Sequence, residues 1–144
     1  MDISKLLQEA DAGSVVAQSV LGICYLDGIN VEVNYKEALR LLTAAARRGA
    51  PRAKANLARM YVEGLGMEKD LPEAMRLYEE AANAGEFFAQ IELARIFLQG
   101  LGVPADPGIA LKWYSAAAAA EGKIDDCDEL REAKTFLKNT NSSK

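Results

Sequence analysis

The sequence predicts an all-α fold of stacked, antiparallel helix pairs, and three observations support this prediction. The chain repeats itself with a period of 36 residues. Each period contains two stretches in which apolar residues recur at helical spacing, separated by glycine or helix-capping residues. No stretch alternates between apolar and polar residues for long enough to indicate a β-strand.

The repeat appears at matched positions of three consecutive units. The clearest matches are Ala17, Ala53 and Ala89, then Leu21, Leu57 and Leu93, then Gly28, Gly64 and Gly100, and in the second half of each unit Ala38, Ala74 and Ala110. One helix pair cannot bury its apolar stripe alone, so neighbouring units complete each other's core. The chain is therefore expected to form a short solenoid.

The period also sets the expected domain organisation, which is a single repeat domain over residues 1–138. This domain comprises a half repeat at 2–13, full repeats at 14–49, 50–85 and 86–122, and a capping helix at 124–138. The last segment departs from the period, since Glu129 and Phe136 replace an expected leucine and glycine. Its apolar residues still share one helical face. Residues 139–144 are expected to be a flexible tail.

Helix ends are marked by residues suited to capping. Gly28 and its repeats follow the first helix of each unit, where a left-handed residue commonly ends a helix. Asn34 and Asp70 suit the N-cap of the second helix, and a glutamate three residues after each resembles a capping box. Pro51 and Pro107 suit the first helical position. Each unit is thus predicted to contain two helices.

Composition disfavours several classes of function. The net charge is −4, from 17 basic and 21 acidic residues, and the basic residues are scattered, so nucleic acid is not the expected partner. No window approaches about 18 apolar residues, so no membrane insertion is expected. Histidine is absent, and nothing pairs a nucleophile with a base, so we expect no enzyme, cofactor or metal site. The distant Cys24 and Cys127 favour reduced thiols in the cytoplasm. A periplasmic location would follow if a signal peptide had been removed.

The repeated residues resemble the Sel1-like repeat family, whose members are related to tetratricopeptide repeats. The shared pattern is A-x-x-x-L-G/A-x-x-Y/F-x-x-G, a glycine-rich loop, Asp or Asn before an alanine-bearing helix, and A-A-x-x-G. It is closest at Gly100–Val103, Asp106, Ala110, Trp113–Tyr114 and Ala117–Ala118, and covers roughly residues 2–122. Asn30 and Glu121 depart from the pattern at glycine positions.

The resemblance implies a right-handed superhelical solenoid that acts as an adaptor or scaffold for a protein or peptide partner, in bacteria also in regulatory or immunity-type roles. In relatives of this architecture the first helix of each pair lines the concave surface. The partner-binding residues implied here are Ser19, Ile23, Asp27, Ala55, Arg59, Glu63, Ile91, Arg95 and Gln99.

Within this set, Arg59 and Arg95 lie one repeat apart and could anchor carboxylates of an acidic peptide, because guanidinium groups bind carboxylates in two parallel hydrogen bonds. The alternative is that they form surface ion pairs, Arg59 with Glu63 and Arg95 with Glu92. Trp113 is expected to serve packing. An alternative function is self-assembly, in which copies of the solenoid stack end to end into a homo-oligomer.

Overall fold

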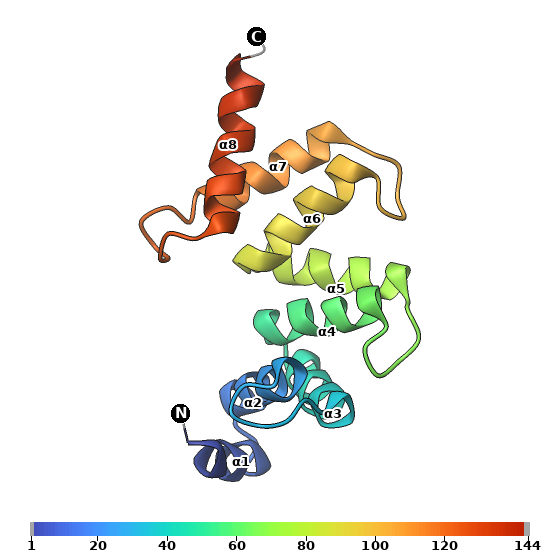
Figure 1. The fold of residues 1–144 in the computed structure, drawn as a ribbon, viewed down its shortest axis with the longest axis vertical. Coiled ribbons are helices and arrows are strands. Elements are labelled where there is room, and N and C mark those ends of the chain that lie inside the picture. Colours follow the sequence, from blue (N-terminus) through green and yellow to red (C-terminus); the bar gives the residue numbers. More distant parts are fainter. Residues whose placement is uncertain (1, 143–144) are drawn as a thin grey trace. The chain divides into compact units, whose positions relative to one another are not determined.

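The computed structural model of the chain describes residues 2–142, and within this range it contains α-helices and no β-strand (Figure 1). The helices are α1 (Ile3–Asp11), α2 (Val15–Asp27), α3 (Tyr35–Arg47), α4 (Pro51–Glu63), α5 (Leu71–Asn83), α6 (Phe87–Gln99), α7 (Pro107–Ala118) and α8 (Asp128–Ser142). The predicted all-α repeat fold is confirmed, with a half repeat at α1 and helix pairs α2/α3, α4/α5 and α6/α7.

The helices fall into two compact units, Met1–Ala81 and Ala82–Lys144. The first unit holds α1 to α4 and nearly all of α5, and in it α2 lies against α1, α3 and α4. The second unit holds α6, α7 and α8, with α7 packed between the other two. Within each unit, therefore, the contacts join helices that follow one another closely in the sequence, as expected for a repeat protein.

The helix ends follow the predicted capping chemistry. The side chain of Asn34 accepts a hydrogen bond from the backbone N–H of Glu37 at 3.1 Å. Asp70 and Asp106 cap α5 and α7 in the same way, at 3.0 and 3.1 Å. The first helices end at glycines 28, 64 and 100, whose φ values of 68 to 70° lie in the left-handed region. The predicted N-caps and C-caps are confirmed.

The loop inside each repeat closes with the same hydrogen bond. The backbone N–H of the N-cap residue donates to the carbonyl of the aromatic residue in the first helix, as in Asn34 to Tyr25 at 2.9 Å. The equivalent bonds run from 70 to 61 at 3.1 Å and from 106 to 97 at 2.8 Å. Asn30, at φ 60°, adopts the left-handed conformation that Gly66 and Gly102 adopt in later repeats. Its replacement of glycine therefore leaves the loop intact, since asparagine tolerates this region better than most residues.

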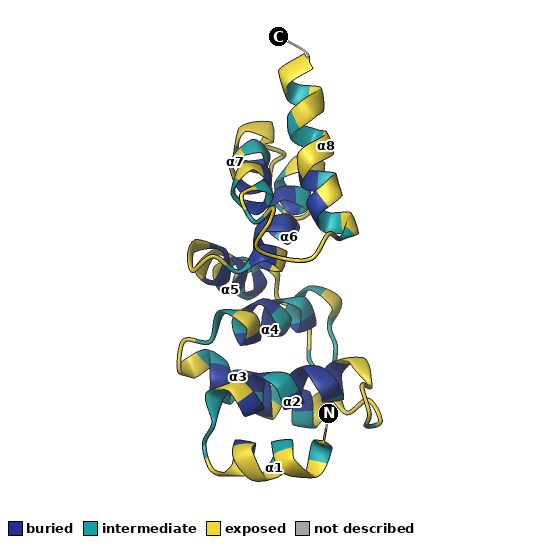
Figure 2. Cartoon of the chain, turned by 90° about the vertical axis from the view of Figure 1, so that its left-hand side faces the viewer, coloured by how far each residue is buried: buried dark blue, intermediate teal, exposed yellow. Residues whose placement is uncertain are grey.

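Each unit has its own buried core. In the first unit, Ala10, Leu21 and Leu41 belong to a buried cluster that joins α1, α2 and α3. In the second unit, Leu93 of α6 and Trp113 of α7 are buried. Figure 2 shows this burial as dark segments along the inner sides of the helices, while the loops remain exposed.

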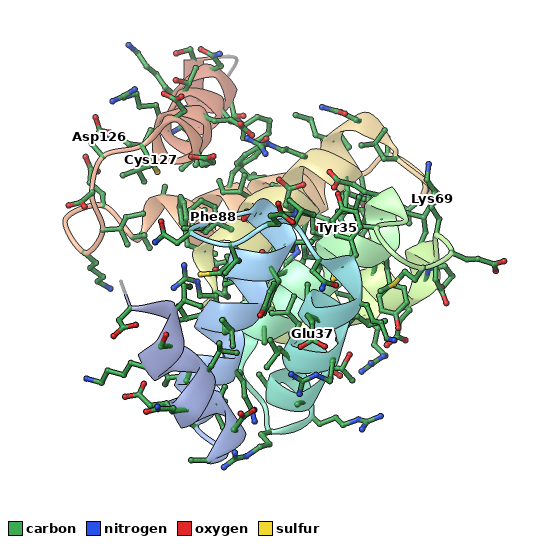
Figure 3. All side chains as sticks on the ribbon, turned by 60° about the horizontal axis from the view of Figure 1, so that its bottom comes forward. Tyr35, Glu37, Lys69, Phe88, Asp126 and Cys127 are labelled. Atoms are coloured by element: carbon green, nitrogen blue, oxygen red, sulfur yellow. The ribbon has the colours of Figure 1, made fainter. Side chains whose placement is uncertain are left out.

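The last helix differs from its predicted limits at both ends. It begins at Asp128 rather than near residue 124, because Asp126 and Cys127 still belong to the preceding loop (Figure 3). It continues to Ser142, so residues 139–142 are helical rather than part of a flexible tail, and residues 143–144 lie outside the described range. The hydroxyls of Thr140 and Ser142 donate to the carbonyls of Phe136 and Lys138, which accommodates these polar residues in the helix.

Candidate functional site

The predicted partner-binding residues lie on α2, α4 and α6, the first helices of the three full repeats. These helices begin with Ser14, Ala50 and Glu86 as N-caps; the side chains of the first and third accept a backbone hydrogen bond, whereas α4 has proline at its first position. The matched alanines 17, 53 and 89 are buried in all three helices. The matched buried alanines thus place the same face of each helix against its neighbours.

Burial divides the predicted residues into two groups. Four are buried: Ser19 (6% exposed), Ile23 (8%), Ala55 (7%) and Ile91 (0%). These side chains offer almost no surface to a partner, because each helix is covered on more than one side. Asp27, Glu63 and Gln99, at the C-terminal ends of the three helices, are exposed, and Arg59 and Arg95 are half-buried. The accessible part of the predicted site is therefore polar and charged.

In the first unit, Arg59 of α4 forms an ion pair with Asp27 of α2. The pair joins two of the predicted site residues from neighbouring repeats, and it takes the place of the alternative pairing with Glu63. The guanidinium is held through one terminal nitrogen, Nη2, while its Nε is buried and has no hydrogen-bond partner among the described residues. Arg59 thus retains a donor that Asp27 does not satisfy.

In the second unit, Arg95 of α6 is held by two carboxylates. Its Nε lies 2.9 Å from Oε2 of Glu132 on α8, and its Nη2 lies 2.6 Å from Oε1 of the same residue. Its Nη1 donates to Glu92 at 2.7 Å, so the alternative ion pair with Glu92 is present. Tyr114 of α7 donates its hydroxyl to Glu132 at 2.6 Å. One carboxylate therefore connects three helices.

The pKa values of this cluster reflect these contacts. Hydrogen bonding from Arg95 holds the pKa of Glu132 below its ordinary value, with a further contribution from Tyr114. The pKa of Arg95 is raised, chiefly by its hydrogen bonds with Glu132. Burial, followed by the hydrogen bond with Glu132, raises the pKa of Tyr114. Near neutral pH the cluster is thus a charged Arg–Glu pair with a neutral tyrosine hydroxyl, an arrangement that orients α8 rather than one that transfers a proton.

The remaining candidates have structural roles. Trp113 is buried, and the ammonium group of Lys112 lies 4.5 Å from the centre of its ring. Burial raises the pKa of the Cys24 thiol, which disfavours the reactive thiolate.

Asp126 and Asp128 pair with Arg131 at the start of α8. Among residues 2–142, no group of three or more side chains is arranged to hold a metal ion.

Sequence reasoning missed Glu132 as a partner of Arg95, and it missed Tyr114 as a donor to Glu132. Glu132 lies in the segment that departs from the 36-residue period, so no matched position pointed to it. Tyr114 occupies a position that packing alone explains. The available signal was weak: Glu132 directly precedes Ala133, which is buried in the structure.

The recurring helix pairs, with their equivalent loop hydrogen bonds, left-handed glycine C-caps and buried alanines, define the chain as an α-helical repeat protein. The sequence matches the Sel1 repeat over residues 15–49, 51–86 and 88–121. The chain therefore belongs to the Sel1 repeat family. Sel1 repeats are helical modules for protein–protein interaction, and proteins built from them generally act through binding rather than catalysis.

Two solved structures share the fold. A Sel1 repeat protein from Oxalobacter formigenes is 40% identical, with 96% of this chain and 98% of that protein covered and a TM-score of 0.74. The protein c5321, a protective antigen of uropathogenic Escherichia coli strains with an SLR fold, is 27% identical, with 83% of this chain and 33% of that protein covered and a TM-score of 0.65. No curated protein matches the chain. No helix within residues 2–142 is both long enough and apolar enough to cross a bilayer.

Proposed function

We propose that this chain is a non-enzymatic binding module that recognises an acidic segment of a protein partner through the exposed residues of its first helices. The residues are Asp27, Arg59 and Glu63 in the first unit and Arg95 and Gln99 in the second. The absence of histidine and of a nucleophile–base pair in the sequence supports binding over catalysis.

The observation that carries the proposal is the single, accessible ion pair of Arg59. Asp27 binds its guanidinium through Nη2, and both side chains are at least about a third exposed. An exposed pair of this kind is worth less than about 1 kcal/mol, so a partner carboxylate can replace Asp27 at small cost. Arg95 differs, because two carboxylates of its own unit already bind it. We therefore assign the main anchoring role to Arg59 and a minor one to Arg95.

The test uses a partner recovered by pull-down from the source organism and titrated calorimetrically. Arg59→Ala is expected to weaken binding by about 2 kcal/mol or more, since it leaves a desolvated partner carboxylate unpaired. Arg131→Ala removes an exposed arginine that pairs only within the start of α8, and it serves as the matched control. Circular dichroism confirms that both variants are folded. Wild-type affinity in Arg59→Ala would place the interface elsewhere.

Self-assembly through the ends remains the alternative, and the terminal helices do not favour it. The exposed residues of α1 are Ser4, Lys5, Gln8, Glu9 and Asp11, and those of α8 include Arg131, Lys134 and Lys138. Such polar faces bury little apolar area on stacking, whereas stable homo-oligomer interfaces are more apolar. A concentration-independent monomer mass in sedimentation would exclude end-to-end stacking.

We further propose a cytoplasmic location. Cys24 and Cys127 form no disulfide within the described residues. Cellular fractionation of the native protein tests this assignment, since recovery in the periplasm would contradict it.

A further inference from the structure

The charges of the chain are unevenly distributed, although its basic residues look scattered when the whole sequence is read. Residues 36–59 hold seven basic side chains and a single acidic one, Glu37. The rest of the chain holds ten basic and twenty acidic residues. A net charge of +6 is thus concentrated in residues 36–59, which cover most of α3 and α4 and their connection, within a chain that is acidic overall.

Part of this charge gathers on the outer face of α3. Lys36, Leu39, Arg40, Thr43, Ala44 and Arg47 surround an open hollow of about 500 Å³ and define what we call the α3 platform. Its floor is apolar or small, with Leu39, Thr43 and Ala44 half-buried, and its three cations are exposed. At a rise of about 1.5 Å per residue, the cations lie about 6 and 10 Å apart along the helix axis.

Two of the three cations have no carboxylate partner. Arg40 donates to Glu37, labelled in Figure 3, with its Nη2 at 2.8 Å from Oε2. Lys36 and Arg47 form no ion pair within residues 2–142. On the equivalent helix α5, by contrast, Arg76 pairs with Glu73 and Glu80. The α3 platform therefore carries two cations without an ion pair in the described part of the chain. On α5 of the next repeat, the arginine is neutralised by carboxylates of the same helix.

The fold does not explain these cations. The positions that match Lys36 in later repeats are Pro72 and Gly108, and those that match Arg47 are Asn83 and Ala119. A lysine in the first turn also opposes the positive end of the helix dipole. Arg47 in the last turn is favourable for the helix dipole, yet the matched positions of the other repeats hold uncharged residues. Because the same helix forms without them, the two cations are not required for packing.

A second hollow adjoins the platform within the first unit. It encloses about 440 Å³, has Thr43 and Arg47 in common with the platform, and reaches Leu57 and Tyr61 on α4 and Leu77 on α5. The hollow is also lined by Lys54, Glu73, Arg76 and Glu80, which form ion pairs with one another. Arg47 therefore stands between the apolar floor on α3 and a mixed furrow of apolar and charged side chains. Such a combination fits a segment that carries apolar side chains as well as carboxylates.

We propose that the α3 platform is a second docking surface, which binds an acidic, amphipathic segment of a partner protein. Carboxylates of the segment pair with Lys36 and Arg47, and its apolar residues cover Leu39 and Ala44. A nucleic acid fits less well, because the cations are few and the floor between them is apolar or small. The proposal rests on an interaction role for the chain but not on Asp27, Arg59 or any other residue of the first helices.

The probe is a fluorescent synthetic helical peptide with glutamate every four residues on one face and leucine and alanine beside it. Its control replaces each glutamate with glutamine. Fluorescence anisotropy is expected to show at least about tenfold weaker binding of the glutamine peptide and a loss of affinity with added salt. Chemical-shift changes are expected on α3. Failure of the glutamate peptide to bind, or equal binding of both peptides, overturns the proposal.

Matched charge reversals locate the site. Lys36→Glu with Arg47→Glu is expected to weaken binding of the glutamate peptide at least about tenfold. Lys123→Glu with Lys138→Glu, at exposed positions of the second unit, makes the same change in net charge and is expected to change affinity less than about twofold. Circular dichroism verifies folding of both variants. If both double substitutions weaken binding of the glutamate peptide equally, the attraction is a general electrostatic one, and the assignment of the site to α3 is overturned.

Two further outcomes separate the hypotheses. Tighter binding of an oligothymidine than of the glutamate peptide, with the same dependence on Lys36 and Arg47, would assign the platform to phosphate chains and overturn a protein ligand. Arg59→Ala is expected to leave peptide binding at the platform unchanged. If Arg59→Ala lowers the affinity for the glutamate peptide and the charge reversals at Lys36 and Arg47 do not, the result would support the first-helix site and overturn the α3 platform.

Discussion

At the scale of single residues, Glu132 is the side chain whose contacts reach furthest. It accepts hydrogen bonds from Arg95 and Tyr114 and so links α8 to α6 and α7. Hydrogen bonds to charged groups contribute about 1.5–3 kcal/mol when protected from solvent. The Arg95 and Glu132 side chains are about a third exposed, at 34% and 32%, so solvent screening reduces that contribution.

We predict that Glu132→Gln lowers the free energy of unfolding by about 1 kcal/mol at neutral pH, measured by urea denaturation. The matched control is Glu37→Gln, which breaks a pair confined to one helix and should cost less than about 0.5 kcal/mol. Equal effects of the two substitutions would show that the connection between helices adds nothing to an ordinary surface pair.

The same residue gives a pH dependence with a definite sign. Because the pKa of folded Glu132 lies below its ordinary value of 4.5, its contribution is present above that pH and is lost as the pH falls through the lowered value. The melting temperatures of the wild type and Glu132→Gln should therefore differ at neutral pH and converge in acid. A difference that persists at the acid end would assign the effect to altered packing rather than to the ionised carboxylate.

At the scale of helices, the parts that could be predicted are those set by local chemistry. The N-cap at Asn34 and the left-handed glycine at 64 were predictable because a cap bonds to a backbone group within a few residues. The contact of Glu132 with Arg95 was not, because it joins residues 37 apart, one of them outside the repeat. Likewise, the period predicted where α2 packs but not that Ile23 is buried, since burial depends on helices from neighbouring repeats.

The sequence predicts that the last helix is a cap, and the contacts of α8 indicate which surface it covers. Its Phe136 ring lies 4.6 Å from that of Tyr114, centre to centre, and Leu130 and Ala133 are buried. The aromatic residue that α8 contacts is thus Tyr114 of α7. Beyond Phe136 the helix extends past α7, and most of its residues there are exposed (Figures 1 and 2).

We predict that deletion of residues 124–144 lowers the melting temperature and promotes aggregation, because it uncovers Tyr114 and removes the partner of Arg95. Deletion of residues 138–144 alone should have little effect, since it spares Leu130, Glu132, Ala133 and Phe136. Thermal melts and light scattering on both truncations distinguish the two. If the longer truncation stays monomeric with an unchanged melting temperature, α8 does not act as a cap.

At the scale of the whole chain, the repeat architecture limits how far a local change spreads. In repeat proteins each unit is stabilised by itself and by its nearest neighbours. In the first unit α1, α2 and α3 share one buried cluster, and in the second unit Glu132 binds only side chains of α6 and α7 among the described residues. A change at Glu132 should therefore be felt mainly within the second unit.

This argument predicts the pattern of amide hydrogen exchange in Glu132→Gln. Protection should fall in α6, α7 and α8, because the substitution removes contacts that oppose local opening of these helices. In α1, α2 and α3 the amides should exchange at wild-type rates under native conditions. Leu21→Ala provides the reciprocal case, because it creates a cavity in the cluster of the first unit and should lower protection there first. A uniform loss of protection across all helices in either variant would show that the chain unfolds as one cooperative body, in which the nearest-neighbour description fails.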